Sequence, residues 1–92
     1  MLNKVKLALR INNSAFDDEI NDLIDACKRD LELAGIASSN INTNDEMIIR
    51  AINLYCKGNF GFDNPDAEKN IKAYESLKSF LTLCSEYSTE EN

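Results

Sequence analysis

Three aspartates on one predicted helix are the first residues in this chain that could do chemistry. Asp18, Asp22 and Asp25 recur at spacings of four and three residues, so they share one face of a helix. Three carboxylates together could hold a hard cation such as Mg²⁺ or Ca²⁺. No ligand loop surrounds them, and the chain contains no histidine. We therefore interpret these aspartates as a solvent-exposed helix face and predict no metal site.

Two short motifs in the second half of the chain have only part of the pattern of a ligand loop. Asp63 and Asp66, on either side of Pro65, lack the order of acidic residues and the distant glutamate of a calcium loop. Gly58 and Gly61 follow a predicted helix instead of a strand, and no Gly-Lys-Ser/Thr follows them, as a phosphate loop requires. We interpret the first motif as helix capping and the second as a chain reversal.

The cysteines Cys27, Cys56 and Cys84 are far apart and lie on or beside apolar helical faces. They form no Cys-x-x-Cys motif and no zinc spacing, so we expect reduced core thiols. Their odd number, and the lack of a recognisable secretory signal, favour a reducing compartment. No apolar run reaches the roughly 18 residues of a membrane span. We expect a soluble, cytoplasmic protein.

Composition also bears on catalysis and on nucleic-acid binding. Serine and tyrosine hydroxyls are present, but no histidine can serve as their base. A dyad based on lysine or aspartate stays open, although nothing points to one, and we predict no catalytic residue, no cofactor and no enzyme. The net charge of −6 argues against a general nucleic-acid binder. A helix-turn-helix is disfavoured because residues 36–44 make too long a turn.

The stretch 45–62 organises the rest of the chain. Its apolar residues wrap most of a helix and leave one polar stripe of Glu46, Arg50, Asn53 and Lys57. Helical periodicity also predicts a short helix over 2–10 and longer ones over 14–34 and 64–87. Capping patterns place the helix starts at Ser14, Thr43 and Asn64.

The expected fold is therefore all-α, a small bundle of one short and three longer helices. Residues 1–87 form one domain, and 88–92 form a short, acidic, disordered tail. The last helix carries a second apolar strip of Phe80, Leu83 and Tyr87. Either the short first helix and the polar loop cover the surplus apolar surface of the bundle, or that surface is a subunit interface.

The order of motifs along the chain resembles a known family. The motifs are Leu7-Ala-Leu-Arg-Ile11, Phe16-Asp-Asp-Glu-Ile20, Leu23-Ile-Asp-Ala-Cys-Lys-Arg-Asp-Leu31 closing on Ala34-Gly-Ile36, Ala51-Ile-Asn-Leu-Tyr55, Gly58-Asn-Phe-Gly61 and Tyr74-Glu-Ser-Leu77. Together they resemble the small head–tail connector (adaptor, or head-completion) proteins of tailed bacteriophages and prophages, up to about Leu83.

The resemblance implies a non-enzymatic structural protein that forms a homo-oligomeric ring at the virion head–tail junction, after a period in the host bacterial cytoplasm. Its partners would be other copies of itself, the portal protein and a stopper or tail-completion protein, with no membrane and no sequence-specific nucleic acid. The ring would complete the DNA-filled head, retain the packaged DNA and let it pass. The residues expected in the core are Phe16, Ile20, Leu23, Ile24, Ile52, Tyr55, Phe60 and Tyr74. The residues expected at interfaces are Ser38, Ser39, Asn40, Phe80, Leu83 and Tyr87.

Two alternatives stay open at this point. The chain could instead be a small regulatory or DNA-contacting helical module of a mobile element, for which salt-sensitive binding to duplex DNA would be the mark. If it is a connector, the isolated chain could be a monomer that forms its ring only on a portal template, because a small interface is weak at low concentration.

Overall fold

Helices make up nearly all of the regular structure in the computed structural model, which describes residues 1–42, 44–61 and 64–88. The elements are α1 (Leu2–Leu9), α2 (Asp17–Leu33), α3 (Ser38–Ile41), α4 (Glu46–Asn59), α5 (Ala67–Leu83) and the 3₁₀ helix η1 (Ser85–Tyr87). Within these residues the β pairing is limited to one isolated bridge between Ile36 and Ser88. The predicted all-α class, with one short and three longer helices, is confirmed. The structure adds α3 inside the predicted loop and separates η1 from the end of α5.

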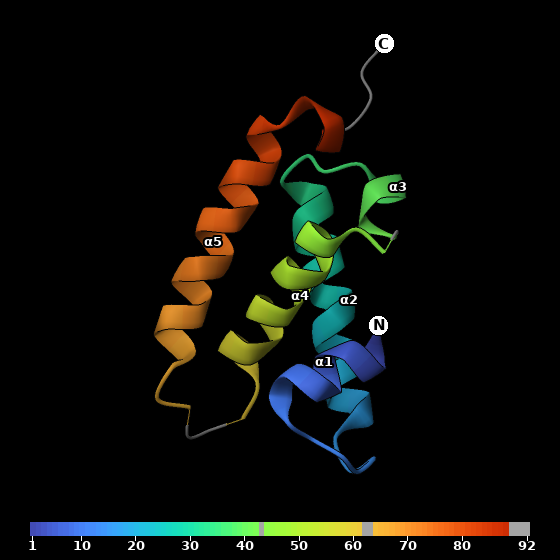
Figure 1. Cartoon of the computed structure of the whole chain (residues 1–92), viewed down its shortest axis with the longest axis vertical. Coiled ribbons are helices and arrows are strands. Elements are labelled where there is room, and N and C mark those ends of the chain that lie inside the picture. The colour runs from blue at the N-terminus through green and yellow to red at the C-terminus, as the bar shows by residue number, and fades with distance from the viewer. Residues whose placement is uncertain (43, 62–63, 89–92) are drawn as a thin grey trace.

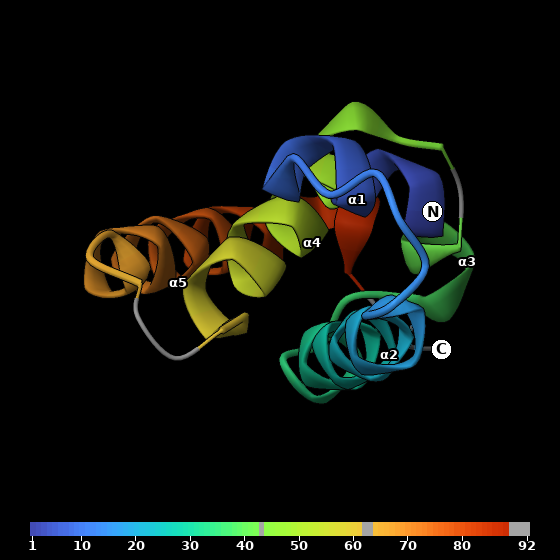
Figure 2. The same ribbon diagram turned by 90° about the horizontal axis from the view of Figure 1, so that it is seen from below.

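Helix α4 is the centre of the bundle. It packs against α5, α2 and α1, and Figure 1 shows α5 and α2 on either side of it. The view from below shows α1 and α2 on different sides of α4 (Figure 2). A helix that is apolar around most of its circumference buries that surface by taking neighbours on several sides. The prediction that this helix is central is confirmed.

The core is aliphatic and continuous. Its buried members are Val5, Ile20, Ile24, Cys27, Leu31, Ile36, Ile41, Ile48, Ala51, Ile52, Cys56, Tyr74 and Leu81. Each large side chain removed from water contributes about 1.5–3 kcal/mol to folding. Helix α1 is too short to be stable alone, and it docks through the fully buried Val5 with Leu2 and Leu9 packed beside it.

Helix α2 begins later than its sequence suggests. The predicted cap at Ser14 is wrong, since α2 starts at Asp17 and its N-cap residue, Phe16, makes no side-chain capping bond. The side chain of Asn13 instead accepts a hydrogen bond from the Ala15 amide at 3.0 Å. This local turn uses the polar residues that the pattern assigned to the helix start.

Helix α4 is capped by Asp45. The carboxylate accepts hydrogen bonds from the amides of Met47 at 2.8 Å and Ile48 at 3.4 Å. Two of the orphan amides of the first turn are thereby satisfied. The predicted cap, Thr43, lies outside the described residues, and the capping oxygen belongs to Asp45.

Asn64 caps the end of α4 instead of the start of α5. Its side-chain amide donates to the carbonyl oxygens of Lys57 at 2.6 Å and Phe60 at 3.3 Å. Helix α5 has Asp66 as its N-cap residue, so the predicted N-cap at Asn64 is wrong. The last carbonyl groups of a helix need hydrogen-bond donors, just as its first amide groups need acceptors. The side-chain amide of Asn64 supplies such a donor at the end of α4.

Gly58 lies inside α4, and its position explains how closely α5 can approach. It is buried, and a Cβ added there would lie 2.6 Å from Ile71 Cγ1 and 3.2 Å from the Ile71 backbone nitrogen. The chain reversal expected at both glycines therefore falls at Gly61, where φ is +83°, while Gly58 serves helix packing.

Candidate functional site

A hydrogen-bonded cluster ties α2 to α5 across the flank of α4. The carboxylate of Asp30 accepts hydrogen bonds from the Tyr74 hydroxyl at 2.5 Å and from the Lys78 ammonium at 2.9 Å. Lys78 also pairs with Glu75 at 3.1 Å, and its nitrogen lies 5.3 Å from the centre of the Tyr74 ring. Tyr55 packs edge-on against the same ring. The cluster fixes the position of α5.

The charges of this cluster stabilise one another. Burial alone would raise the pKa of Asp30, but the hydrogen bonds from Tyr74 and Lys78 outweigh burial and hold that pKa below its usual range. Burial, together with the bond to Asp30, raises the pKa of Tyr74. Burial would lower the pKa of Lys78, but its bonds to Asp30 and Glu75 raise it. At neutral pH the carboxylate and ammonium are therefore charged and the phenol is neutral, which suits a structural bond.

The cysteines are free thiols. Cys27 and Cys56 are buried, and burial raises the pKa of each to about 12. Because only a thiolate is a strong nucleophile or metal ligand, neither residue is reactive at neutral pH. Cys84 is partly exposed.

The C-terminal segment is hydrogen-bonded to the N-terminal end of α4 and to the segment around α3. Tyr87 donates its hydroxyl to the Asp45 carboxylate at 2.8 Å, and its carbonyl accepts from the Ala37 amide at 2.9 Å. The Asn40 side chain donates to the Glu86 carbonyl at 3.0 Å. We call these three contacts the C-terminal latch. It joins η1, the α3 segment and the N-terminus of α4.

The pKa values of Asp45 and Tyr87 are both shifted by the hydrogen bond between them. Burial would raise the pKa of Asp45, but the bonds from Tyr87 and from the Met47 and Ile48 amides lower it. The hydrogen bond to Asp45 is the main cause that raises the pKa of Tyr87 to about 12. Asp45 therefore serves both the cap of α4 and the latch.

The residues expected at interfaces separate into two groups. Ser38, Ser39, Phe80 and Leu83 are exposed, with Phe80 at 53% and Leu83 at 84%. Asn40 and Tyr87 are partly buried, because the latch occupies both. The structure thus engages Asn40 and Tyr87 within one chain, while an interface role for the exposed Ser38, Ser39, Phe80 and Leu83 stays a prediction.

The residues expected in the core also separate by burial. Ile20, Ile24, Ile52 and Tyr74 are buried, and Leu23, Tyr55 and Phe60 are partly buried against them. The expectation for Phe16 is wrong, because this side chain is 45% exposed. Phe16 precedes α2 at the edge of the bundle, where its ring packs edge-on against the ring of Phe60 with 5.4 Å between the ring centroids.

The acidic residues considered as metal ligands do not come together into a ligand group within the described residues. Asp18, Asp22 and Asp25 are exposed on α2, and Asp63 lies outside the described residues. Across residues 1–42, 44–61 and 64–88, no group of three His, Cys, Asp or Glu side chains could hold a metal ion. None of the helices in this part of the chain is long and apolar enough to cross a bilayer.

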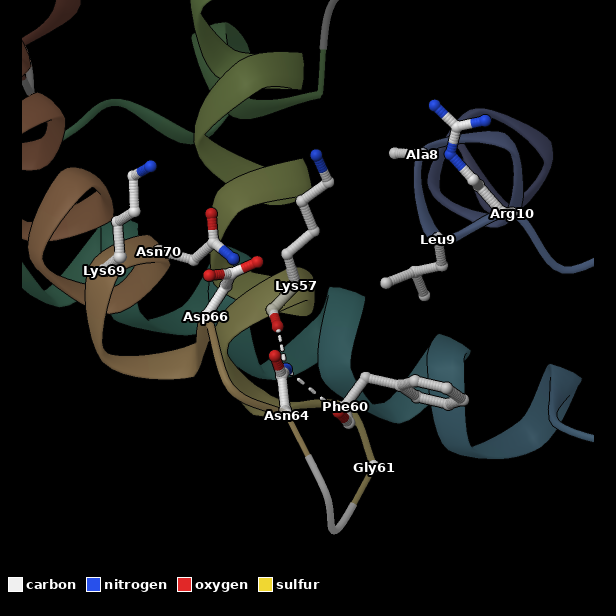
Figure 3. A pocket seen from close by; sticks show the side chains of 10 residues that line it. All are labelled: Ala8, Leu9, Arg10, Lys57, Phe60, Gly61, Asn64, Asp66, Lys69 and Asn70. Carbon is white, nitrogen blue, oxygen red and sulfur yellow. Dashed lines mark hydrogen bonds between the residues drawn. The ribbon is translucent and has the colours of Figure 1, made fainter.

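Sequence reasoning missed a surface cavity that is lined by residues of three helices and their ends. It measures about 500 Å³ and lies between the end of α1, the end of α4 and the start of α5 (Figure 3). Its lining includes Arg10, Lys57 and Lys69, together with the carboxylate of Asp66. A smaller cavity of about 200 Å³ between α1 and α4 shares Lys57 with it and adds Arg50.

We call Arg10, Arg50, Lys57 and Lys69 the basic patch. Among the described residues, the ion pairs shorter than 4 Å involve the cations Lys6, Arg29, Lys72 and Lys78. None of these pairs involves a residue of the basic patch. Arg50 and Lys57 belong to the polar stripe visible in the sequence. Arg10 and Lys69 join them only through the packing of α1 and α5 on α4.

Comparison with known proteins identifies the family. The family model described as phage connector protein matches residues 1–88, which is nearly the whole chain. Comparison with curated proteins and with solved structures gives no significant match. The helical bundle and this match agree with the motif order of the sequence, and the chain belongs to the phage connector protein family.

Proposed function

We propose that this chain is a non-enzymatic phage structural protein that forms a ring between the portal of the DNA-filled head and the tail or stopper protein. The observation that carries the proposal is the family match over residues 1–88. In this role the ring completes the head, retains the packaged DNA and gives it a passage during ejection. The chain acts at the virion head–tail junction.

Exposed apolar side chains on α5 support a docking role. Phe80 and Leu83 are 53% and 84% exposed and lie one turn apart near the end of the helix. Figure 1 shows α5 at the edge of the bundle, with α4 alongside it. Large apolar side chains grouped on an open helix are typical of protein interaction sites. We assign this end of α5 to contact with a neighbouring virion protein.

The test is to mix the purified chain with purified portal complex and to image the mixture by electron microscopy. We expect a ring-shaped density beneath the portal. The variant carrying Phe80→Ser and Leu83→Ser should bind the portal at least about tenfold more weakly, since interface anchors carry most of the binding energy. Leu7→Ser is the matched control, because Leu7 is 80% exposed on α1. Absence of any binding over a range of salt concentrations would refute the proposal.

Whether the ring needs the portal as a template is a separate measurement. We propose that the isolated chain is a monomer, because the exposed apolar area is small and association has a large entropic cost. Sedimentation velocity at increasing concentration should then give one slow species. A ring that persists in dilute solution would contradict this point and leave the connector function intact.

A further inference from the structure

Two surfaces of the described residues carry mostly one sign of charge each, although Glu46 and Asp66 line the cavities of the basic patch and Lys28 and Arg29 lie on α2. Asp18, Asp22 and Asp25 are exposed along α2, on the side of the helix away from the buried Ile20 and Ile24. We call these three aspartates the acidic face. The basic patch lies on α1, α4 and the start of α5. Seen from below, α2 lies on one side of α4 and α1 on another (Figure 2).

The two surfaces match in spacing as well as in sign. Asp18 and Asp25 are seven residues apart on α2, and Arg50 and Lys57 are seven residues apart on α4. Seven residues are close to two helical turns, so both pairs lie on one face of their helix and span about 10 Å along its axis. Two helices placed side by side could therefore form both ion pairs at once.

The acidic face and the basic patch cannot pair with each other within one chain. The acidic face points away from α4, which carries Arg50 and Lys57. The acidic face on α2 and the basic patch on α1 and α4 lie on different sides of the molecule (Figure 2), so a single two-fold contact does not engage both surfaces of each copy. Two copies can join head to tail, and a head-to-tail contact closes into a ring when its rotation divides a full turn.

We propose that the basic patch of one copy binds the acidic face of α2 on a neighbouring copy of this chain. The inference rests on the proposed ring and names the surfaces that build it. Arginine presents a planar fork that suits carboxylates, and lysine adds a flexible cation beside it. A second copy is favoured over DNA as the occupant, because the chain carries a net charge of −6 that repels DNA, while the complementary surface is present on every copy.

Two double variants test the contact. The acid-reversed variant carries Asp18→Lys and Asp25→Lys, and the base-reversed variant carries Arg50→Glu and Lys57→Glu. Each should repel its own copies, whereas an equimolar mixture of the two should associate. Both variants remain negative overall, because each double reversal changes the charge of −6 by about four. General attraction between the variants therefore cannot explain association of the mixture.

Sedimentation velocity in the presence of portal complex supplies the readout, because the isolated chain is proposed to be a monomer and the ring is expected on the portal. We expect each variant alone to assemble at least about tenfold more weakly than the unaltered chain, since like charges placed together cost several kcal/mol. The mixture should recover assembly, and raising the salt from about 0.05 M to 0.5 M should weaken it again. Because Lys57 is partly buried, Arg50→Glu with Lys69→Glu serves as a second base-reversed variant, and circular dichroism checks that each variant folds. The control is Lys4→Glu with Lys72→Glu, two exposed positions outside the patch.

The outcomes separate the inference from the proposed function. If the unaltered chain forms a ring on the portal and the variants do so equally well, the inference is refuted and the connector function stands. If the mixture fails to associate although both variants are folded, the inference is refuted as well. If the base-reversed variant loses salt-sensitive binding to duplex DNA and keeps assembly, the patch is a DNA site and the inference is overturned.

Discussion

Replacing Gly58 with alanine tests whether close approach of α5 governs the stability of the bundle. In a helix interior alanine is favoured over glycine by about 1 kcal/mol, so propensity alone predicts a more stable protein. The structure predicts the opposite. The new Cβ would lie 2.6 Å from Ile71 Cγ1, 3.2 Å from the Ile71 nitrogen and 3.4 Å from the Ala67 carbonyl oxygen.

The size of the effect follows from these distances. The Ile71 side chain is 38% exposed and can rotate away, but the backbone nitrogen can move only with α5 itself. Overpacking that shifts backbone costs about 1–3 kcal/mol, which exceeds the gain in propensity. We expect Gly58→Ala to lose about 1 kcal/mol, or roughly 4–8 °C in Tm for a domain of this size.

Thermal and urea unfolding followed by circular dichroism would measure the change. Ser76→Ala is the control, because Ser76 is exposed on α5 and reports helix propensity without a close contact. Adding Ile71→Ala to Gly58→Ala removes the 2.6 Å contact, so the two changes should be coupled and the double variant should recover part of the loss. A Gly58→Ala protein as stable as Ser76→Ala, or more stable, would refute the reasoning.

Four further predictions concern the hydrogen-bonded clusters and the thiols. Tyr74→Phe should cost about 1.5–3 kcal/mol in urea unfolding, because the lost bond is to a charged carboxylate; a change below 0.5 kcal/mol, the low end for any net hydrogen bond, would show that the bond adds little. Tyr87→Phe should cost about 0.5–1.5 kcal/mol and speed hydrogen exchange at the Ala37 amide, with unchanged exchange counting against the latch. The lowered pKa of Asp45 means that the latch contributes stability above the ordinary aspartate pKa of about 3.9 and loses it as pH falls through the lower folded value. The raised pKa of Tyr87 means that its share is complete below about pH 10 and is lost as pH rises toward 12, so a pH series on Tyr87→Phe should show a smaller alkaline loss, and the remaining loss comes from Tyr74 and the buried thiols. A thiol reagent should modify Cys84 first in the native protein, with Cys27 reacting at the rate of unfolding, and equal rates would contradict the assigned burial.

Helical periodicity predicted the bundle because the side chains that a helix buries recur at helical spacing along one of its faces. Ile20, Ile24 and Ile52 recur at helical spacing, and each is buried. Phe16 failed the same test because it precedes α2, and periodicity does not report where a helix ends relative to its neighbours. A large apolar side chain at the edge of a bundle has the same sequence context as one in the core.

The helix caps could not be chosen from sequence because several residues compete for each one. Asn42, Asn44 and Asp45 all have side chains that cap helices well. Asp45 is the cap, and its second oxygen accepts a bond from Tyr87, which is 42 residues away. That choice depends on a tertiary contact. Asn64 illustrates the same limit, since its amide serves the helix before it instead of the one after it.

The two charged surfaces differ in how visible they are to sequence reasoning, and the difference bears on function. The acidic face is visible, since its three aspartates lie on one helix, but alone it has the appearance of ordinary solvated surface. The basic patch is assembled from three elements, so no window of the sequence contains it. Only when the bundle forms do these four cations come together, beside Glu46 and Asp66, while the acidic face lies on a different helix, α2. A surface pair that is complementary between copies and separated within one copy gives a reason for assembly that neither helix has alone.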